Sequence, residues 1–234
     1  MTPKSVCVSI LMCIPIAICA EGWADDEGLL LHYTFKGVKN EVVLDVSGHG
    51  NHGTVFGAEK ARGRKGARPR ALRFDGEDDF VRVPVNISPG SLPQITITAW
   101  VRPEGTKERE VIVSNGDTVA KPYCRALGIS TGTRSQKRHY NGWDEDEGLW
   151  DIQPLANDTW SFVALMYDQE IGMAWIYVNG RAYKEPGLAS EGYDYFLIGG
   201  HPAYPMNFTG RIDEVRIYNR VLDVLELDTL FKAD

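Results

Sequence analysis

Cysteine is scarce in the part of this chain that is expected to fold. Of the 4 cysteines in 234 residues, Cys7, Cys13 and Cys19 lie in a short N-terminal apolar segment, and only Cys124 lies beyond it. A single cysteine excludes an internal disulfide, so Cys124 is interpreted as a small buried apolar residue. A domain without crosslinks would gain stability from a bound structural ion.

Long apolar runs are absent after the N-terminus, which argues against a membrane span. The one such run, from Val6 to Cys19, follows Lys4 and precedes the small residues Gly22 and Ala24. This pattern is typical of a cleaved secretory signal. We therefore expect residues 1–24 to be a signal peptide and the protein to be secreted or periplasmic.

A lipoprotein signal is the alternative interpretation of this segment, with Cys19 as the acylated residue. The preceding Ile18 is bulky at a position where such signals need a small residue. The sequence therefore favours a free secreted domain.

Positive charge is also in short supply, with a net charge of -7. This balance argues against general nucleic-acid binding, which needs a basic surface. One local exception is the stretch Lys60 to Arg73, rich in lysine and arginine. It is interpreted as a solvated connecting loop, or alternatively as a patch that binds acidic polysaccharide.

Helical periodicity is missing until Val221 to Lys232, and short strand patterns fill the rest. The clearest, Ile95 to Val101, alternates so that Ile95, Ile97, Ala99 and Val101 form one apolar face. No linker or repeat divides the chain. Residues 25–234 are therefore predicted to form one all-β, two-sheet antiparallel sandwich with a short C-terminal helix.

One late strand pattern, Phe208 to Tyr218, contains an aspartate on an apolar face. Strict alternation places Asp213 beside Val215 and Ile217. A carboxylate on a core face is costly without a cation or several donors. Asp213 is thus predicted to have a partner.

A candidate partner is the glycine-rich loop from Asp45 to Gly53. Asp45 and Asn51 offer side-chain oxygens, and the glycines allow backbone carbonyls to turn inward. Such oxygen ligands suit calcium. We expect an ion to join this loop to the Asp213 strand.

Several segments of the sequence together resemble the laminin-G-like, concanavalin A-type jelly-roll family of bacterial secreted proteins. They occur in the family's order and are Asp45–Gly53, Ala71–Gly76, Ile97–Pro103, Trp160–Leu165, Ile176–Gly180 and Gly210–Arg220. The resemblance implies two curved antiparallel sheets and, in many relatives, sugar binding at the concave face or loop rim.

The resemblance also implies a structural calcium near the chain termini. Carried over, Asp45 and Asn51 match the loop part of that site and Asp213 matches the strand part. The alternative for Asp213 is an ion pair with Arg211 or Arg216. A further alternative is a zinc site that uses the loop histidines His49 and His52.

Some relatives are glycosidases or lyases, so an enzyme is a further interpretation. The glycosidase pattern Glu-x-Asp-x-x-Glu is absent, and the nearest acidic run, Asp144 to Glu147, is contiguous and flanked by glycines. Lyases of this fold use His, Tyr, Arg and Gln on adjacent strands. Here those residue types crowd into Gln136 to Tyr140, which is interpreted as a polar loop.

Aromatic residues beside polar ones favour sugar binding, because sugar C–H faces stack on aromatic rings. One such group is Tyr140, Trp143 and Trp150, and a second surrounds Gly199 and Gly200. The second group comprises Tyr193, Tyr195, His201, Tyr204 and Phe208. We predict Tyr140, Trp143, Trp150 and Tyr204 as ligand contacts.

The sequence thus predicts a secreted, calcium-stabilised jelly-roll domain that binds carbohydrate or a cell-surface glycan. The first alternative is an adhesion or assembly module that binds a surface protein, and the second is a polysaccharide-degrading enzyme. The fold alone does not decide between them.

Overall fold

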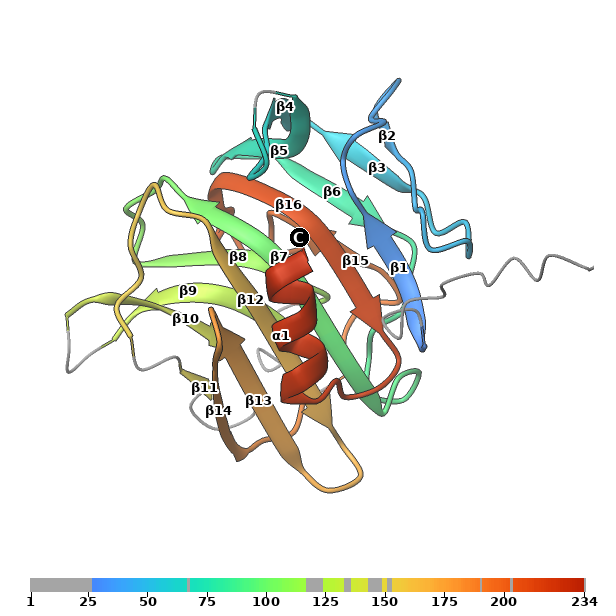
Figure 1. Cartoon of the computed structure of the whole chain (residues 1–234), viewed down its shortest axis with the longest axis vertical. Helices are drawn as coiled ribbons and strands as arrows, with labels where there is room; N and C mark the ends of the chain where they lie inside the picture. Colours follow the sequence, from blue (N-terminus) through green and yellow to red (C-terminus); the bar gives the residue numbers. More distant parts are fainter. Residues whose placement is uncertain are drawn as a thin grey trace, which may run out of the picture.

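Two antiparallel sheets face each other in the computed structural model of the chain (Figure 1). The structure describes residues 27–66, 68–116, 124–132, 136–142, 149–150, 153–189, 191–202 and 204–233. The two facing sheets confirm the expected all-β sandwich. Within the described ranges, no helix has the length and apolar character of a bilayer-spanning segment.

The first sheet, sheet A, carries the longest strands. Its order is β14 (Arg181–Pro186), β13 (Met173–Val178), β12 (Ser161–Asp168), β7 (Gln94–Pro103), β16 (Thr209–Tyr218), β5 (Pro69–Asp75) and β4 (Glu59–Arg62), with β1 (Leu29–Tyr33) paired to β16. Strand β13 pairs with β12 on one side and with β14 on the other. The Asn179-Gly180 turn connects β13 to β14. Both residues of that turn have positive φ, as its sequence predicts.

The second sheet, sheet B, brings together short strands from distant parts of the chain. Its order is β11 (Leu149–Trp150), β10 (Arg138–Gly142), β9 (Ala126–Thr131), β8 (Arg109–Ser114), β15 (Phe196–Ile198), β6 (Phe80–Val83), β3 (Gly53–Phe56) and β2 (Val42–Val43). The late strand β15 lies between the early strands β6 and β8. This insertion places the connection after β15 beside the turn before β6.

The main core lies between the sheets. Ile95, Ile97, Ala99 and Val101 of β7 all point into it and are fully buried, as their alternation predicts. Sheet B contributes inward residues such as Val81 and Phe196. Burial of such side chains contributes roughly 1.5–3 kcal/mol each to folding.

A second apolar cluster covers the outer face of sheet A, beneath helix α1 (Val224–Ala233) (Figure 1). The ring of Trp100 stacks on Phe231 of the helix, with 5.7 Å between centroids, and packs on Phe162. Trp100 therefore anchors the helix to the sheet, on the face opposite the main core.

The helix begins three residues later than the expected Val221, at Val224. The cause is a cap at Asp223, whose Oδ1 accepts hydrogen bonds from the backbone N–H groups of Leu225 (2.8 Å) and Glu226 (2.9 Å). The Glu226 carboxylate in turn accepts the N–H of Asp223 at 2.8 Å. This reciprocal capping box fixes the first turn.

Two segments expected to be loops contain strands. In the basic stretch, Lys60 to Arg62 belong to β4, which pairs with β5, while residues 63–66 and 68 lie in the connection between the two strands, as expected. The segment around Tyr140 forms β10, which pairs with β9. In β10 the Tyr140 ring points into the core and Arg138 pairs with the buried Glu110, so these side chains do not form a lyase-like cluster.

Candidate functional site

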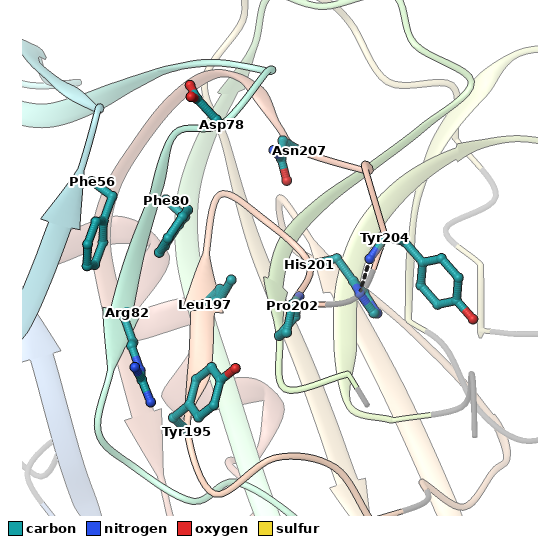
Figure 2. Close-up of a pocket in the computed structure, with 10 residues that line it drawn as sticks. All are labelled: Phe56, Asp78, Phe80, Arg82, Tyr195, Leu197, His201, Pro202, Tyr204 and Asn207. Atoms are coloured by element: carbon teal, nitrogen blue, oxygen red, sulfur yellow. Dashed lines mark hydrogen bonds between the residues drawn. The ribbon is translucent and has the colours of Figure 1, made fainter. Parts of the chain in front are cut away.

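An open groove of about 390 Å³ lies on the outer face of sheet B, where β3, β6 and β15 run side by side (Figure 2). Its lining combines aromatic rings with a few polar side chains. The lining residues are Phe56, Asp78, Phe80, Arg82, Tyr195, Leu197, His201, Pro202, Tyr204 and Asn207.

Strand alternation explains why these side chains reach the surface. In β6, Val81 and Val83 enter the core, so Phe80 and Arg82 point outward. The paired positions on the neighbouring strands carry Phe56 opposite Phe80 and Leu197 opposite Arg82. Opposite residues share a face of the sheet. The floor of the groove is therefore built from one outward row on each strand.

The centre of the groove is aromatic. The rings of Phe56 and Phe80 stack with 4.6 Å between centroids and 25° between planes. Phe56 is nevertheless 44% exposed. An exposed aromatic ring held flat by a second ring offers a preformed apolar surface to a ligand.

One end of the groove is formed by Arg82 and Tyr195. The guanidinium carbon of Arg82 lies 4.1 Å from the centroid of the Tyr195 ring, a cation–π contact. The Tyr195 ring also stacks on Tyr193, with 5.2 Å between centroids. These stacked planes orient the Arg82 guanidinium.

The loop that connects β15 to β16 forms another side of the groove. It begins at Gly199, whose φ of +84° favours glycine and where a Cβ atom would lie 2.3 Å from the Phe74 ring. Beyond this turn, the backbone N–H of Tyr204 donates to Nδ1 of His201 at 3.2 Å. The two rings lie 5.0 Å apart, so this bond helps to hold Tyr204 at the groove.

His201 is uncharged at neutral pH. Burial lowers the pKa of its imidazole from 6.5 to about 4. Because Nδ1 accepts a hydrogen bond, the neutral ring carries its proton on Nε2. The groove therefore contains a neutral imidazole beside Tyr204.

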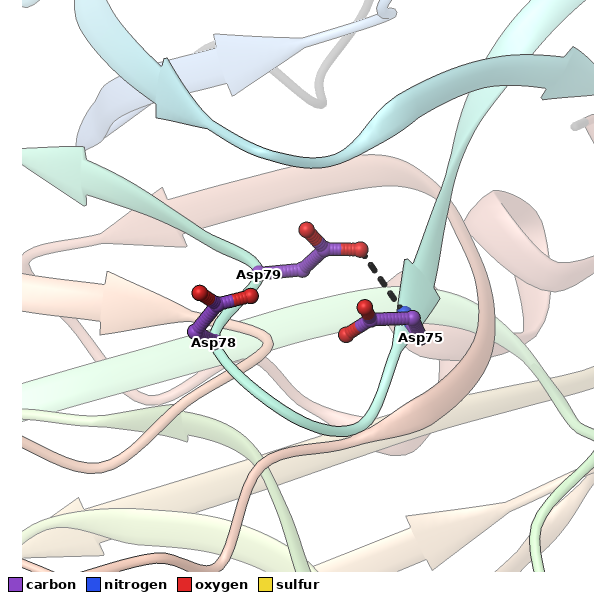
Figure 3. Close-up of side chains that lie close together, drawn as sticks. All are labelled: Asp75, Asp78 and Asp79. Carbon is purple, nitrogen blue, oxygen red and sulfur yellow. Dashed lines mark hydrogen bonds between the residues drawn. The ribbon is translucent and has the colours of Figure 1, made fainter.

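The turn from β5 to β6 closes the end that contains Asp78 and Asn207. Figure 3 shows Asp75, Asp78 and Asp79 clustered there, with carboxylate oxygens within 4.8 Å of one another. Burial, together with the charges of Asp75 and Asp78, raises the pKa of Asp79. One Asp79 oxygen accepts the backbone N–H of Asp75 at 2.8 Å. This hydrogen bond closes the turn from β5 to β6.

A second hollow, of about 450 Å³, continues from the first on the same face. Its lining residues are His52, Thr54, Arg82, Pro84, Asp194 and Tyr195. Arg82 and Tyr195 belong to both hollows and form the ridge between them. The two hollows therefore adjoin one another through these shared residues.

Two of the four predicted ligand contacts, Tyr140 and Tyr204, have described side chains, and these lie in different places. Tyr204 lines the groove, whereas Tyr140 is 1% exposed and packs in the core between the sheets. This placement argues against Tyr140 as a ligand contact. Trp150 lies in β11 opposite Asn141, but its side chain falls outside the described residues, as does all of Trp143.

The second aromatic group is divided in a similar way. Tyr195, His201 and Tyr204 meet at the groove, while Phe208 is fully buried in the core. Sequence reasoning missed Phe56, Phe80 and Arg82. The signal for them was available, because alternation with the buried Val55, Val81 and Val83 turns all three outward.

The predicted metal ligands Asp45 and Asn51 share one loop. The Asp45 carboxylate accepts four hydrogen bonds, from the backbone N–H groups of His32, Ser47 and Asn51 and from the Ser47 hydroxyl, at 2.8–3.0 Å. Burial acts to raise the pKa of Asp45, but these bonds outweigh it and hold the pKa below its ordinary value. The Asn51 side-chain amide donates to the Leu30 carbonyl at 2.9 Å.

Asp213 lies on the other face of β16 from the one expected. A bulge at Glu214, where φ is +48°, interrupts the alternation. Ile212, Val215 and Ile217 therefore enter the core, while Asp213 pairs with Trp100 on the helix-covered side. Its carboxylate accepts the backbone N–H groups of Arg64 (3.3 Å) and Glu214 (3.0 Å).

The contacts of Asp45 and Asp213 share one neighbour. His32 donates its backbone N–H to Asp45 and also lines a small hollow of about 210 Å³ beside Asp213. This hollow contains Glu214 as well as Arg64, Arg70 and Arg216, whose positive charge opposes a cation next to Asp213. Calcium binding by the chain stays a prediction.

Comparison with known proteins agrees with the fold. Domain 4 of AbnA, an extracellular GH43 arabinanase from Geobacillus stearothermophilus solved with arabinotriose, superposes with a TM-score of 0.64 at 20% identity, covering 86% of this chain and 97% of that domain. The Trypanosoma rangeli sialidase, solved with sialic acid, gives 0.67 at 18% identity over 87% of this chain and 32% of that one.

The binding domain of botulinum neurotoxin serotype D gives a TM-score of 0.65 at 13% identity, covering 90% of this chain and 52% of that one. At these identities, the likeness concerns the fold. No curated protein matches the sequence significantly.

The family model Laminin_G_3, described as the concanavalin A-like lectin/glucanases superfamily, matches residues 75–228. That range contains most of both sheets and all of the groove except Phe56. The chain therefore belongs to the Laminin_G_3 family of the concanavalin A-like lectin/glucanase superfamily.

Proposed function

We propose that the chain is a carbohydrate-binding domain and that the groove over β3, β6 and β15 is its binding site. The observation that carries the proposal is the exposed Phe56 ring, stacked on Phe80 and bordered by polar groups. Sugar C–H faces stack on such rings, and side chains such as Asp78 and Asn207 would take hydroxyl hydrogen bonds.

The superposed arabinanase domain and sialidase were solved with arabinotriose and with sialic acid. These ligands support a saccharide as the class of ligand. Binding is proposed in preference to hydrolysis because glycosidases generally use two carboxylates across the scissile bond, and Asp78 is the one carboxylate of the described groove lining.

An extracytoplasmic location forms part of the proposal and rests on the expected signal peptide. A bound calcium ion is proposed from the oxygen ligands of the Asp45 loop and from the family resemblance. Neither property is needed for the groove to bind sugar, and calcium binding is tested separately.

The experiment is a glycan array probed with the purified chain and with Tyr204→Ala. We expect selective binding by the wild type and weaker binding by the variant at an unchanged melting temperature. Capture of a surface protein without binding to any glycan would instead favour the adhesion module and contradict this proposal.

A further inference from the structure

The ridge between the two hollows carries an arginine whose charge is not neutralised by the described part of the chain. Arg82 is exposed, and its guanidinium lies over the Tyr195 ring at 4.1 Å. Among the described residues, no carboxylate lies within ion-pair distance of it and no hydrogen bond uses its side chain. Most other arginines of the sheets, such as Arg102 and Arg211, pair with carboxylates.

Stacking fixes the plane of the guanidinium while leaving its N–H groups available. A planar fork of N–H donors matches the two oxygens of a carboxylate, and such charge-assisted pairs are stronger than neutral hydrogen bonds. Because Tyr195 stacks on Tyr193 in turn, the fork is supported by a rigid base. Less conformational freedom is then lost when a ligand binds.

The position of Arg82 determines which part of a ligand it would meet. It lies at the opposite end of the groove from Asp78, with Phe80 between them (Figure 2). A sugar stacked on Phe56 would therefore extend one substituent toward Arg82. Asp194 lines the adjoining hollow.

The acidic residues of the two hollows disfavour a ligand that carries many negative charges. Asp78 and Asp194 would repel a polyanion that filled both hollows, since like charges at close range are unfavourable. A ligand with one carboxylate at Arg82 and neutral sugars elsewhere would pair with the arginine and would avoid repulsion by the two aspartates. This also argues against heavily sulfated polysaccharides, which need a basic cluster.

Resting on the proposed function, we infer that the groove selects oligosaccharides that carry a single carboxylated sugar, and that Arg82 is the residue that recognises the carboxylate. Phe56 and Phe80 supply affinity for the sugar rings, and Arg82 supplies the preference for the acid.

The test compares two ligand pairs by titration calorimetry: a xylo-oligosaccharide bearing one glucuronic acid, and sialyllactose, each as the free acid and as its methyl ester. Esterification removes the charge and retains the sugar rings. At least one free acid is expected to bind about tenfold or more tightly than its ester, as expected for a hydrogen-bonded charge pair.

Three variants assign this preference to the arginine. Arg82→Gln is expected to remove the difference between acid and ester while changing ester binding less than about threefold. Arg82→Lys, which keeps the charge without the fork, is expected to restore part of it. Arg181→Gln, at an exposed position on β14 of the other sheet, makes the same charge change as a control and should leave both affinities unchanged.

The outcomes separate the two proposals. Equal binding of acid and ester in both pairs, or a preference that survives in Arg82→Gln, would overturn the inference while leaving the groove as a sugar site. Absence of binding to these probes and to every glycan on the array would overturn the proposed function as well. Melting temperatures of all variants verify that each is folded.

Discussion

Phe56 and Phe80 stack face to face on the outside of sheet B, with 4.6 Å between their centroids, at directly paired positions of β3 and β6. Cross-strand aromatic pairs usually stabilise a sheet. Here the outer ring remains 44% exposed, so part of its apolar surface is available to a ligand. In the proposed function, this pair of rings both stabilises sheet B and contacts the sugar.

Replacing Phe56 with alanine should weaken sugar binding more than it weakens the fold. Loss of one stacked ring is expected to cost about threefold to tenfold in affinity, from roughly 0.5–1.5 kcal/mol per aromatic contact. The free energy of unfolding should fall by about 1 kcal/mol or less, because the ring is half exposed. Leu225→Ala, at a 76% exposed position on α1, is the matched control and should change neither quantity.

The buried His201 should make the fold sensitive to acid. Its pKa is about 4 in the folded chain and 6.5 as the reference value, so between these pH values only the unfolded state binds the proton. Stability contributed by the neutral ring is present above pH 6.5 and is lost progressively as the pH falls to about 4, by up to roughly 3 kcal/mol.

Denaturant unfolding of wild type and His201→Gln across this pH window measures the effect. The difference between the two free energies should shrink as the pH falls, because the variant has no proton to bind. Parallel curves would contradict the burial of a neutral imidazole.

Helix α1 should depend on the stack between Trp100 and Phe231. Trp100→Ala is expected to lower the free energy of unfolding by about 3–5 kcal/mol, as for other buried aromatic residues. A double-mutant cycle with Phe231→Ala should give a coupling of roughly 0.5–1.5 kcal/mol. Val224→Ala, at an exposed position of the same helix, serves as the control. Zero coupling would show that the helix is held by other contacts.

Substitution of Asp45 distinguishes two ways in which its carboxylate could be held, by hydrogen bonds alone or by a calcium ion. Asp45→Asn replaces one acceptor oxygen by a donor that faces N–H or O–H groups, so we expect a loss of about 1–3 kcal/mol. If hydrogen bonds hold this carboxylate, thermal unfolding in calcium and in chelator will give the same loss. A loss seen only in calcium would instead assign an ion to Asp45 and support the predicted site.

The sequence was sufficient to predict the sandwich and the terminal helix because both have regular apolar patterns. The inward face of β7 follows strict alternation without interruption. The same reasoning placed Asp213 on the wrong face, because a single bulge at Glu214 shifts the pattern. Nothing in the residue types around Asp213 signals such a bulge.

The groove was only partly predictable for a different reason. Tyr204 and Tyr195 were identifiable as a cluster that is local in sequence, but Phe56 and Phe80 meet them through the pairing of β15 with β6. Alternation indicates which side chains point outward. It does not indicate which strands lie side by side, since that depends on the topology of the whole sheet.

The most direct test of the account is the location of the bound sugar. Amide chemical shifts of the isotope-labelled chain, followed during titration with an oligosaccharide selected on the array, would give it. The account predicts that the largest changes fall on Phe56, Phe80, Arg82, Leu197 and Tyr204, with none in α1. Changes confined to the β9 and β10 end of sheet B would contradict it and would move the site toward the segment that contains Trp143.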